Sequence, residues 1–369
     1  MEYLSLILIG FIMAVTLGQI ILPRVMVISL RKRLFDIPDA RKVHQSPIPR
    51  LGGVTFFPVV MLVMCGVSLL QLHSGKLQLS FFGGNIVSEM LCLIVGLMML
   101  YIMGITDDLI GVAYRRKFLI QLTAAAFIPL AGVQLDSFYG LFGIYDIDAW
   151  VGVPLTLLLT VFITNAINLI DGIDGLASSL SMVALLMFGI GFTMYDRWMY
   201  ALLSFVCVGV LIPFFLYNVF GNADRGRKIF MGDTGALTLG FILSLLSMKY
   251  IMVSGQSRWE ADGAPVVLVF SLLLVPCLDV CRVVLGRIRR KAHPFKPDKS
   301  HIHHLFLLMG FTPRRSLVLI LSLSVSFIAL TYALIHCEIP ASAVLLVDLL
   351  VWMLVHVWFG KLVAERKEA

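Results

Sequence analysis

Apolar stretches of about the length needed to cross a bilayer follow one another along nearly the whole chain. A transmembrane helix needs about 20 apolar residues, and eleven stretches bounded by charges, glycine or proline satisfy that requirement. The pattern therefore predicts an all-α polytopic membrane protein with about eleven transmembrane helices. The expected spans are residues 3–23, 51–71, 86–106, 118–134, 150–167, 176–194, 198–219, 230–249, 264–285, 316–336 and 340–360.

Basic residues are distributed unequally between the two sides of these spans. Lys and Arg accumulate in the cytoplasmic loops of membrane proteins. One set of loops, with the C-terminal tail, carries 24 Lys and Arg residues, whereas the opposite set carries four. This asymmetry predicts an N-terminus outside the cell and a C-terminus in the cytoplasm. The cytoplasmic loops are then 24–50, 107–117, 165–175, 220–229 and 286–315.

The composition narrows the class of protein further. Hydrophobic residues make up 59% of the 369 and charged residues 14%, whereas about a quarter of a soluble globular chain is charged. Topology explains the net charge of +7, so no nucleic-acid partner is expected. The six cysteines lack CxxC pairing and are expected to pack as small apolar side chains. We interpret residues 1–369 as a single integral membrane domain whose first span is retained, not cleaved as a signal peptide.

Polar residues at the ends of apolar helices are the informative exceptions, because charge within a membrane chain is costly and tends to mark function. Four groups occur, and the topology inferred from Lys and Arg alone places all four on the cytoplasmic face. We therefore expect an active site at that face. The groups are Asp107 and Asp108; Asn165, Asn168, Asp171 and Asp174; Asp233; and His301, His303 and His304.

The residue types in these groups favour phosphate and metal chemistry. Adjacent carboxylates repel by roughly 3 kcal/mol, so a cation is expected among them. Asp and Asn oxygens suit Mg²⁺, which usually completes its shell with waters and substrate phosphates. Lys117 follows the first Asp pair closely and is suited to holding phosphate. Zinc is disfavoured because HIHH lacks the HExxH spacing and no cysteine is near. Any single Asp could instead be a helix N-cap or a turn residue.

Taken together, these motifs resemble those of the polyprenyl-phosphate N-acetylhexosamine-1-phosphate transferase family. The resemblance extends from about Arg41 to Gly310 and is carried by the DD pair, NAINLIDGIDGL, FMGDTG and PDKSHIHHLFLLMGF. It is closest to the bacterial branch that uses UDP-N-acetylglucosamine (UDP-GlcNAc) and undecaprenyl phosphate. The phospho-N-acetylmuramoyl-pentapeptide branch has a third consecutive histidine where this chain has Leu305, so that alternative is less favoured.

The resemblance also implies roles for single residues. It places Asp107 and Asp108 at the polyprenyl phosphate and catalytic centre, with Asp171 and Asp174 as catalytic or supporting carboxylates. Asn168 and Asp233 are implied as ligands of Mg²⁺, with Mn²⁺ as an alternative metal. The expected substrate-binding residues are Lys117, Asn165, His301, His303, His304, His44 and Arg50.

The reaction implied by the resemblance is transfer of a sugar-1-phosphate from a UDP-N-acetylhexosamine to undecaprenyl phosphate, with release of UMP. Such a step initiates a lipid-linked glycan in the bacterial cytoplasmic (inner) membrane. A different UDP-N-acetylhexosamine donor remains an alternative, and the oligomeric state is open between monomer and homodimer. An ion-coupled secondary transporter is the rival from another class, but its polar residues should lie near the bilayer midplane.

Overall fold

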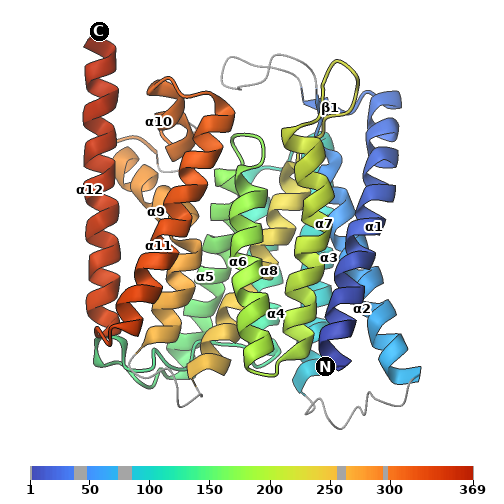
Figure 1. The fold of residues 1–369 in the computed structure, drawn as a ribbon, viewed down its shortest axis with the longest axis horizontal. Coiled ribbons are helices and arrows are strands. Elements are labelled where there is room, and N and C mark those ends of the chain that lie inside the picture. Colours follow the sequence, from blue (N-terminus) through green and yellow to red (C-terminus); the bar gives the residue numbers. More distant parts are fainter. Residues whose placement is uncertain (1, 37–47, 74–84, 256–262, 294–297, 369) are drawn as a thin grey trace.

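The computed structural model describes residues 2–36, 48–73, 85–255, 263–293 and 298–368. Long helices run side by side in one bundle, and the chain termini lie at its opposite ends (Figure 1). The helices are α1 (Glu2–Arg31), α2 (Phe56–His73), α3 (Asn85–Ile110), α4 (Tyr114–Leu130), α5 (Ala149–Ile170), α6 (Leu176–Met194), α7 (Trp198–Val219), α8 (Gly232–Gly255), α9 (Ala264–Arg289), α10 (Ile302–Leu308), α11 (Pro313–His336) and α12 (Ala341–Glu368), with short 3-10 turns η1 (Leu51–Thr55) and η3 (Leu141–Gly143).

The all-α polytopic class is confirmed, and the chain is a multi-pass membrane protein. Ten helices within the described residues are long and apolar enough to cross a bilayer. The expected fourth span, 118–134, corresponds to α4, whose 17 residues extend about 25 Å. This helix packs against α3 and α5 inside the bundle. A total of eleven spans therefore remains a prediction, because α4 is shorter than the other ten.

Several helices extend beyond their expected ends. α1 continues to Arg31, so the loop expected at 24–50 begins later, because the apolar run after Arg24 still favours helix and Arg24 bonds the Ile20 carbonyl oxygen. α3 likewise runs to Ile110 and places Asp107 and Asp108 in its last turn. The expected loops 107–117 and 165–175 are therefore mostly helical. α6 and α7, in contrast, begin and end at the predicted residues.

α8 is the central helix of the bundle. In its most apolar stretch 83% of the residues are buried, against 22% in α1, α11 and α12. It contacts α3, α5, α6 and α9, and small residues permit this close packing. A side chain added at Gly240 would lie 2.6 Å from the Thr164 Cα atom of α5. Asp233 consequently belongs to the most buried of the ten candidate membrane spans.

A short backbone ladder joins the segment before α8 to the segment before α2. The Gly52 and Gly53 amides donate to the carbonyl oxygens of Phe230 and Met231. At the same end of the bundle, β1 (Phe35–Asp36) and β2 (Ile48–Pro49) form a two-residue antiparallel ribbon (Figure 1). The Gly52–Gly53 pair thus fixes the start of α8 against η1.

Gly53 tests this close approach. A Cβ atom there would lie 2.1 Å from both the Cα and N atoms of Gly235, which are backbone atoms that cannot rotate away. We expect Gly53→Ala to destabilise the protein by about 1–3 kcal/mol or more, lowering the midpoint of thermal unfolding in detergent. The control is Gly66→Ala in α2, whose new methyl group would approach Met13 Cε no closer than 3.8 Å. Equal midpoints for the two variants would contradict this account.

Candidate active site

A lysine joins two of the predicted acidic groups. Lys117 Nζ, in the first turn of α4, lies 2.6 Å from Asp107 Oδ2 and 2.6 Å from Asp233 Oδ2. Asp107 comes from the last turn of α3, where Gly111 takes a φ of +74° and ends the helix. The ammonium group therefore offsets the repulsion between two carboxylates that lie 126 positions apart in sequence.

Asp108 holds the first turn of α8. Its Oδ1 accepts a hydrogen bond from the Asp233 amide at 2.8 Å, and its Oδ2 accepts from the amide and the hydroxyl of Thr234 at 3.0 and 2.6 Å. Amides in the first turn of a helix have no partner within the helix, so an acidic side chain satisfies them and favours the helix dipole. Asp108 thus fixes the position of Asp233.

Two asparagines of α5 have different surroundings, although one turn separates them. Asn168 Nδ2 donates to Asp233 Oδ1 at 2.7 Å, which leaves the Asn168 amide oxygen for another ligand. Asn165 Nδ2 instead donates to Gln121 Oε1 at 2.6 Å, across the α4–α5 contact. The predicted metal pair, Asn168 and Asp233, is therefore brought together, whereas Asn165 holds two helices together behind it.

The loop between α5 and α6 carries the second acidic group. Lys228 Nζ lies 2.5 Å from Asp174 Oδ2, and Asn218 at the end of α7 accepts from the Gly175 amide at 2.6 Å. Asn218 also donates to the Ile229 carbonyl oxygen, so it connects this loop to the segment before α8. Asp171 makes no ion pair of this kind in the described residues, and burial and neighbouring carboxylates raise its pKa to about 7.

The histidines reach the site on the short helix α10. The His303 ring lies directly against Gly172: a Cβ atom added to Gly172 would lie 2.1 Å from His303 Nε2. Burial and the adjacent His304 lower the pKa of His303 to about 3, so its ring is neutral near pH 7. Burial also lowers the pKa of His304. His301 lies behind these two, with its Nδ1 atom 2.8 Å from Asp279 Oδ2.

These segments surround a cavity of about 470 Å³. The cavity is bordered by the end of α3, the start of α8, the α5–α6 loop and α10. Among the predicted residues, Lys117 and Asp107 do not line the cavity. Lys117 contacts Asp233, which does line it, and Asp107 contacts Lys117. His44 lies outside the described residues. The predicted residues that line the cavity are Arg50, Asp108, Asn168, Asp171, Asp174, Asp233, His303 and His304.

The donors present suit a hard cation that keeps part of its shell for substrate. Two carboxylate oxygens, of Asp107 and Asp233, already lie within 2.6 Å of one cationic nitrogen, and the Asn168 side-chain amide contacts the other Asp233 oxygen. No cluster of three or more His, Cys, Asp or Glu side chains poised to hold a metal occurs in the described ranges. Few protein ligands, all of them oxygens, match the way proteins hold Mg²⁺ beside phosphate.

Sequence reasoning missed several residues that build this site. Thr234 adjoins the Asp233 motif and could have been identified from that position. Gln121, Asn218 and Asp279 lie inside apolar helices, where a polar side chain was the available signal.

Asp171 predicts a pH dependence of stability. Because its pKa of about 7 exceeds the ordinary value of about 3.9, the native protein keeps a proton that the unfolded chain has lost between about pH 4 and pH 7. Stability from this group therefore falls as pH rises through that window. Asp171→Asn removes the titration. Thermal unfolding in detergent and EDTA should show the variant gaining over wild type from pH 5 to pH 8.

The matched control for this series is Asp136→Asn, which changes an exposed carboxyl group in the loop between α4 and α5. A difference between Asp171→Asn and wild type that stays constant from pH 5 to pH 8 would show that the Asp171 carboxyl does not titrate near neutrality.

Comparison with known proteins assigns this arrangement to a family. Residues 90–251 match the model of glycosyl transferase family 4. The chain is 31% identical over 366 residues to a probable undecaprenyl-phosphate N-acetylglucosaminyl 1-phosphate transferase of Bacillus subtilis, which covers 99% of this chain and 95% of that relative. It is 32% identical over 312 residues to a decaprenyl-phosphate N-acetylglucosaminephosphotransferase of Mycolicibacterium smegmatis, covering 80% and 74% of the two chains.

A third relative is the undecaprenyl-phosphate alpha-N-acetylglucosaminyl 1-phosphate transferase of Yersinia pestis, 30% identical over 295 residues that cover 79% of this chain and 74% of that one. The matched region of the family model includes the DD pair, the NLIDGIDGL loop and the GDTG start of α8, which are the segments that meet around the cavity. The chain therefore belongs to the glycosyl transferase family 4 group of polyprenyl-phosphate N-acetylhexosamine-1-phosphate transferases.

Proposed function

We propose that this protein transfers N-acetylglucosamine-1-phosphate from UDP-GlcNAc to undecaprenyl phosphate, releasing UMP. The observation that carries the proposal is the junction of Lys117, Asp107 and Asp233 beside a cavity that also holds two histidines. Both reactants are anionic, so catalysis requires charge neutralisation and alignment above all. The relatives named for N-acetylglucosamine support this sugar over the muramoyl-pentapeptide alternative.

Mg²⁺ is the proposed metal, with Asp233 and Asn168 as its ligands. When bound, it would neutralise phosphate charge beside the carboxylates. Lys117 is the movable partner in this arrangement: its ammonium lies between Asp107 and Asp233 and can turn to a phosphate oxygen once another cation contacts Asp233. Binding of metal and binding of phosphate by Lys117 are thereby coupled.

The proposed reaction is a single displacement at phosphorus. An oxygen of the lipid phosphate attacks the β-phosphorus of the UDP-sugar, the bond from that phosphorus to the bridging oxygen breaks, and UMP leaves with the electron pair. A phosphate monoester has a second pKa near 6, so the nucleophile is largely ionised at neutral pH. Asp107 then orients the lipid phosphate or accepts its residual proton, and neutral His303 and His304 border the space for the pyrophosphate.

We also infer the orientation in the membrane. The segments around the cavity belong to the end of the bundle where α10 and the β1–β2 ribbon lie (Figure 1). The loops that the sequence assigns to this side, together with the C-terminal tail, contain 24 Lys and Arg residues. Basic loops favour the cytoplasm, where nucleotide sugars are present. The proposed location is the bacterial cytoplasmic membrane with the cavity facing inward. A midplane transport site fits poorly, because the polar cluster is confined to one end.

The dependence of the transferase reaction on metal and on Asp233 tests the proposed function. Purified protein with radiolabelled UDP-GlcNAc, undecaprenyl phosphate and Mg²⁺ should release UMP and form an organic-extractable product. EDTA should stop both reversibly, with recovery in Mg²⁺ or Mn²⁺. Asp233→Asn should lower the rate by at least 100-fold, about 2.7 kcal/mol of transition-state stabilisation, while Asp136→Asn at the opposite end stays at the wild-type rate. Absence of UMP release by wild type would refute this donor and acceptor pair.

The single displacement has its own test. Without lipid acceptor, protein incubated with UDP-GlcNAc carrying a labelled β-phosphate should retain no label after denaturation, because the β-phosphorus never bonds to a side chain. Recovery of stoichiometric label on the wild-type protein, lost in Asp107→Asn, would instead establish a two-step reaction.

A further inference from the structure

Asp279 is a buried carboxylate that the proposed reaction does not use directly. It lies in α9 with an exposed fraction of 0%, two helical turns before the end of the apolar part of that helix. Its side chain does not line the cavity. A fully buried charge is costly unless it is paired and hydrogen-bonded, so the partners of Asp279 indicate what it holds in place.

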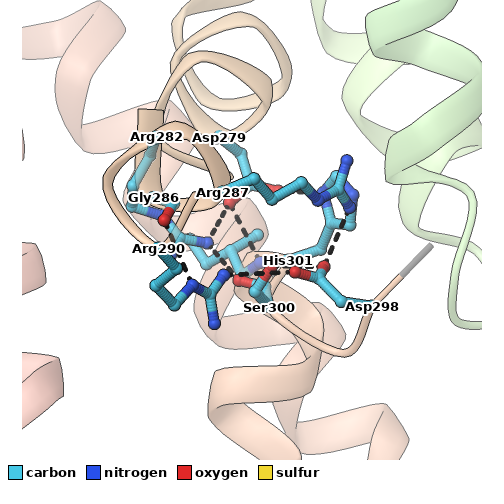
Figure 2. Close-up of polar contacts among 9 residues, drawn as sticks. Asp279, Arg282, Gly286, Arg287, Arg290, Asp298, Ser300 and His301 are labelled. Carbon is cyan, nitrogen blue, oxygen red and sulfur yellow. Dashed lines mark hydrogen bonds and ion pairs between the residues drawn. The ribbon is translucent and has the colours of Figure 1, made fainter. Parts of the chain in front are cut away.

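Within the described residues, the hydrogen-bond partners of the Asp279 carboxylate belong to α9 itself or to the start of α10. Oδ2 lies 2.8 Å from His301 Nδ1, and Oδ1 accepts from the Ile302 amide at 3.0 Å. Arg282 lies 2.6 Å from the same Oδ1 and also donates to the Ser300 carbonyl oxygen at 2.5 Å. Figure 2 shows that the carboxylate of Asp279 and the guanidinium of Arg282 both form polar contacts with the segment that leads into α10.

A second set of polar contacts, around Asp298, joins the same segment to the end of α9. Asp298 accepts from Arg287, in the last turn of α9, at 2.8 Å and from Arg290, the residue that follows α9, at 3.2 Å. The Ser300 hydroxyl also donates to it (Figure 2). Residues 298–300 are therefore joined to the end of α9 by two sets of contacts, one around Asp298 and one around Asp279 and Arg282. The hydrogen bonds of Asp279 extend to His301 and to the Ile302 amide of α10.

The held segment positions the histidines of the cavity. His303 follows Ile302 directly in α10, and its ring fills the space above Gly172. The His301 and His303 rings lie nearly parallel with 6.0 Å between their centroids, whereas the His303 and His304 rings are tilted by 48° with 4.2 Å between their centroids. Displacement of the start of α10 would therefore move His303 relative to Gly172 in the α5–α6 loop.

We propose that Asp279 is a positioning residue, which orients α10 through His301 and the Ile302 amide so that His303 and His304 border the donor side of the cavity. As an acceptor at His301 Nδ1, the carboxylate also selects the ring orientation and tautomer of His301, in the way that outer carboxylates orient functional histidines. The kinetic part of this proposal rests on the proposed function, whereas its structural part does not.

Asp279→Asn is the informative variant, because it preserves shape while replacing one acceptor oxygen by an amide group that donates. Hydrogen–deuterium exchange of the full-length protein in detergent should be faster in the variant at 302–308 and unchanged in α6 and α7. In the assay with UDP-GlcNAc and undecaprenyl phosphate, kcat/KM for the nucleotide sugar should fall by about 10- to 100-fold. The KM for the lipid phosphate should stay within about twofold, which general unfolding would not produce.

Asp348→Asn is the matched control. Asp348 also has an exposed fraction of 0% and accepts a hydrogen bond from Thr331 at 2.7 Å, but this contact joins α12 to α11, remote from α10. The control variant should keep wild-type exchange at 302–308 and wild-type kcat/KM. Comparable loss of transferase activity in both Asp variants would mean that any buried carboxylate has the same effect, and would overturn the positioning role.

A double-mutant cycle that combines Asp279→Asn with His301→Asn tests whether Asp279 acts through His301. If Asp279 acts partly through His301, the loss in Asp279→Asn/His301→Asn should be well below the product of the two single losses; a full product would overturn the proposal. Unchanged exchange at 302–308 in Asp279→Asn would overturn it as well. If wild type makes no product from UDP-GlcNAc, the proposed function fails, and the exchange result still decides whether Asp279 holds α10.

Discussion

The position of one ammonium group determines how the acidic residues of this protein can coexist. Lys117 lies 2.6 Å from carboxylate oxygens of both Asp107 and Asp233, at the point where α3, α4 and α8 meet. Without a cation there, two carboxylates at helix ends within a largely apolar bundle would repel strongly. The contact also brings the end of α3 and the start of α8 into register, and the Asp108 hydrogen bonds to the first turn of α8 complete that junction.

The acidic residues and the histidines that line the cavity are held in place differently. Asp233 belongs to α8, the most buried helix, and its neighbour Gly235 lies against Gly53 without room for a side chain. The histidine side rests on α10, a helix of seven residues whose Ile302 and Phe306 are buried and which packs against α11 and α12. Hydrogen bonds to Asp279 join the start of α10 to α9. The acidic side is therefore fixed by the packing of a long, buried helix, whereas the histidine side combines the packing of a short helix with a few polar contacts.

Sequence patterns predicted most of the fold because hydrophobic length is a strong local signal. α6 and α7 match their expected ends because polar or turn-forming residues flank them closely. The span predicted at 3–23 ends before α1 does, because a charged residue such as Arg24 marks a boundary in the sequence, although a long basic side chain can reach polar surroundings. For the site, residue chemistry and the family resemblance predict Asp107, Asp233 and the histidines. The partnerships of Asp279 with His301 and of Asn165 with Gln121 join distant segments, and no local spacing records them.

The order in which the segments occur in the chain has a consequence for biosynthesis. The acidic side needs α3, α4, α5 and α8, which are all made before residue 256, but His303 reaches Gly172 only after α9 has followed them. A nascent chain that has already inserted its first eight helices thus carries an open, unfinished pocket. The cavity is completed late, when residues near 300 pack against a loop synthesised about 130 residues earlier. A chain truncated before α10 therefore lacks the histidines that line the cavity.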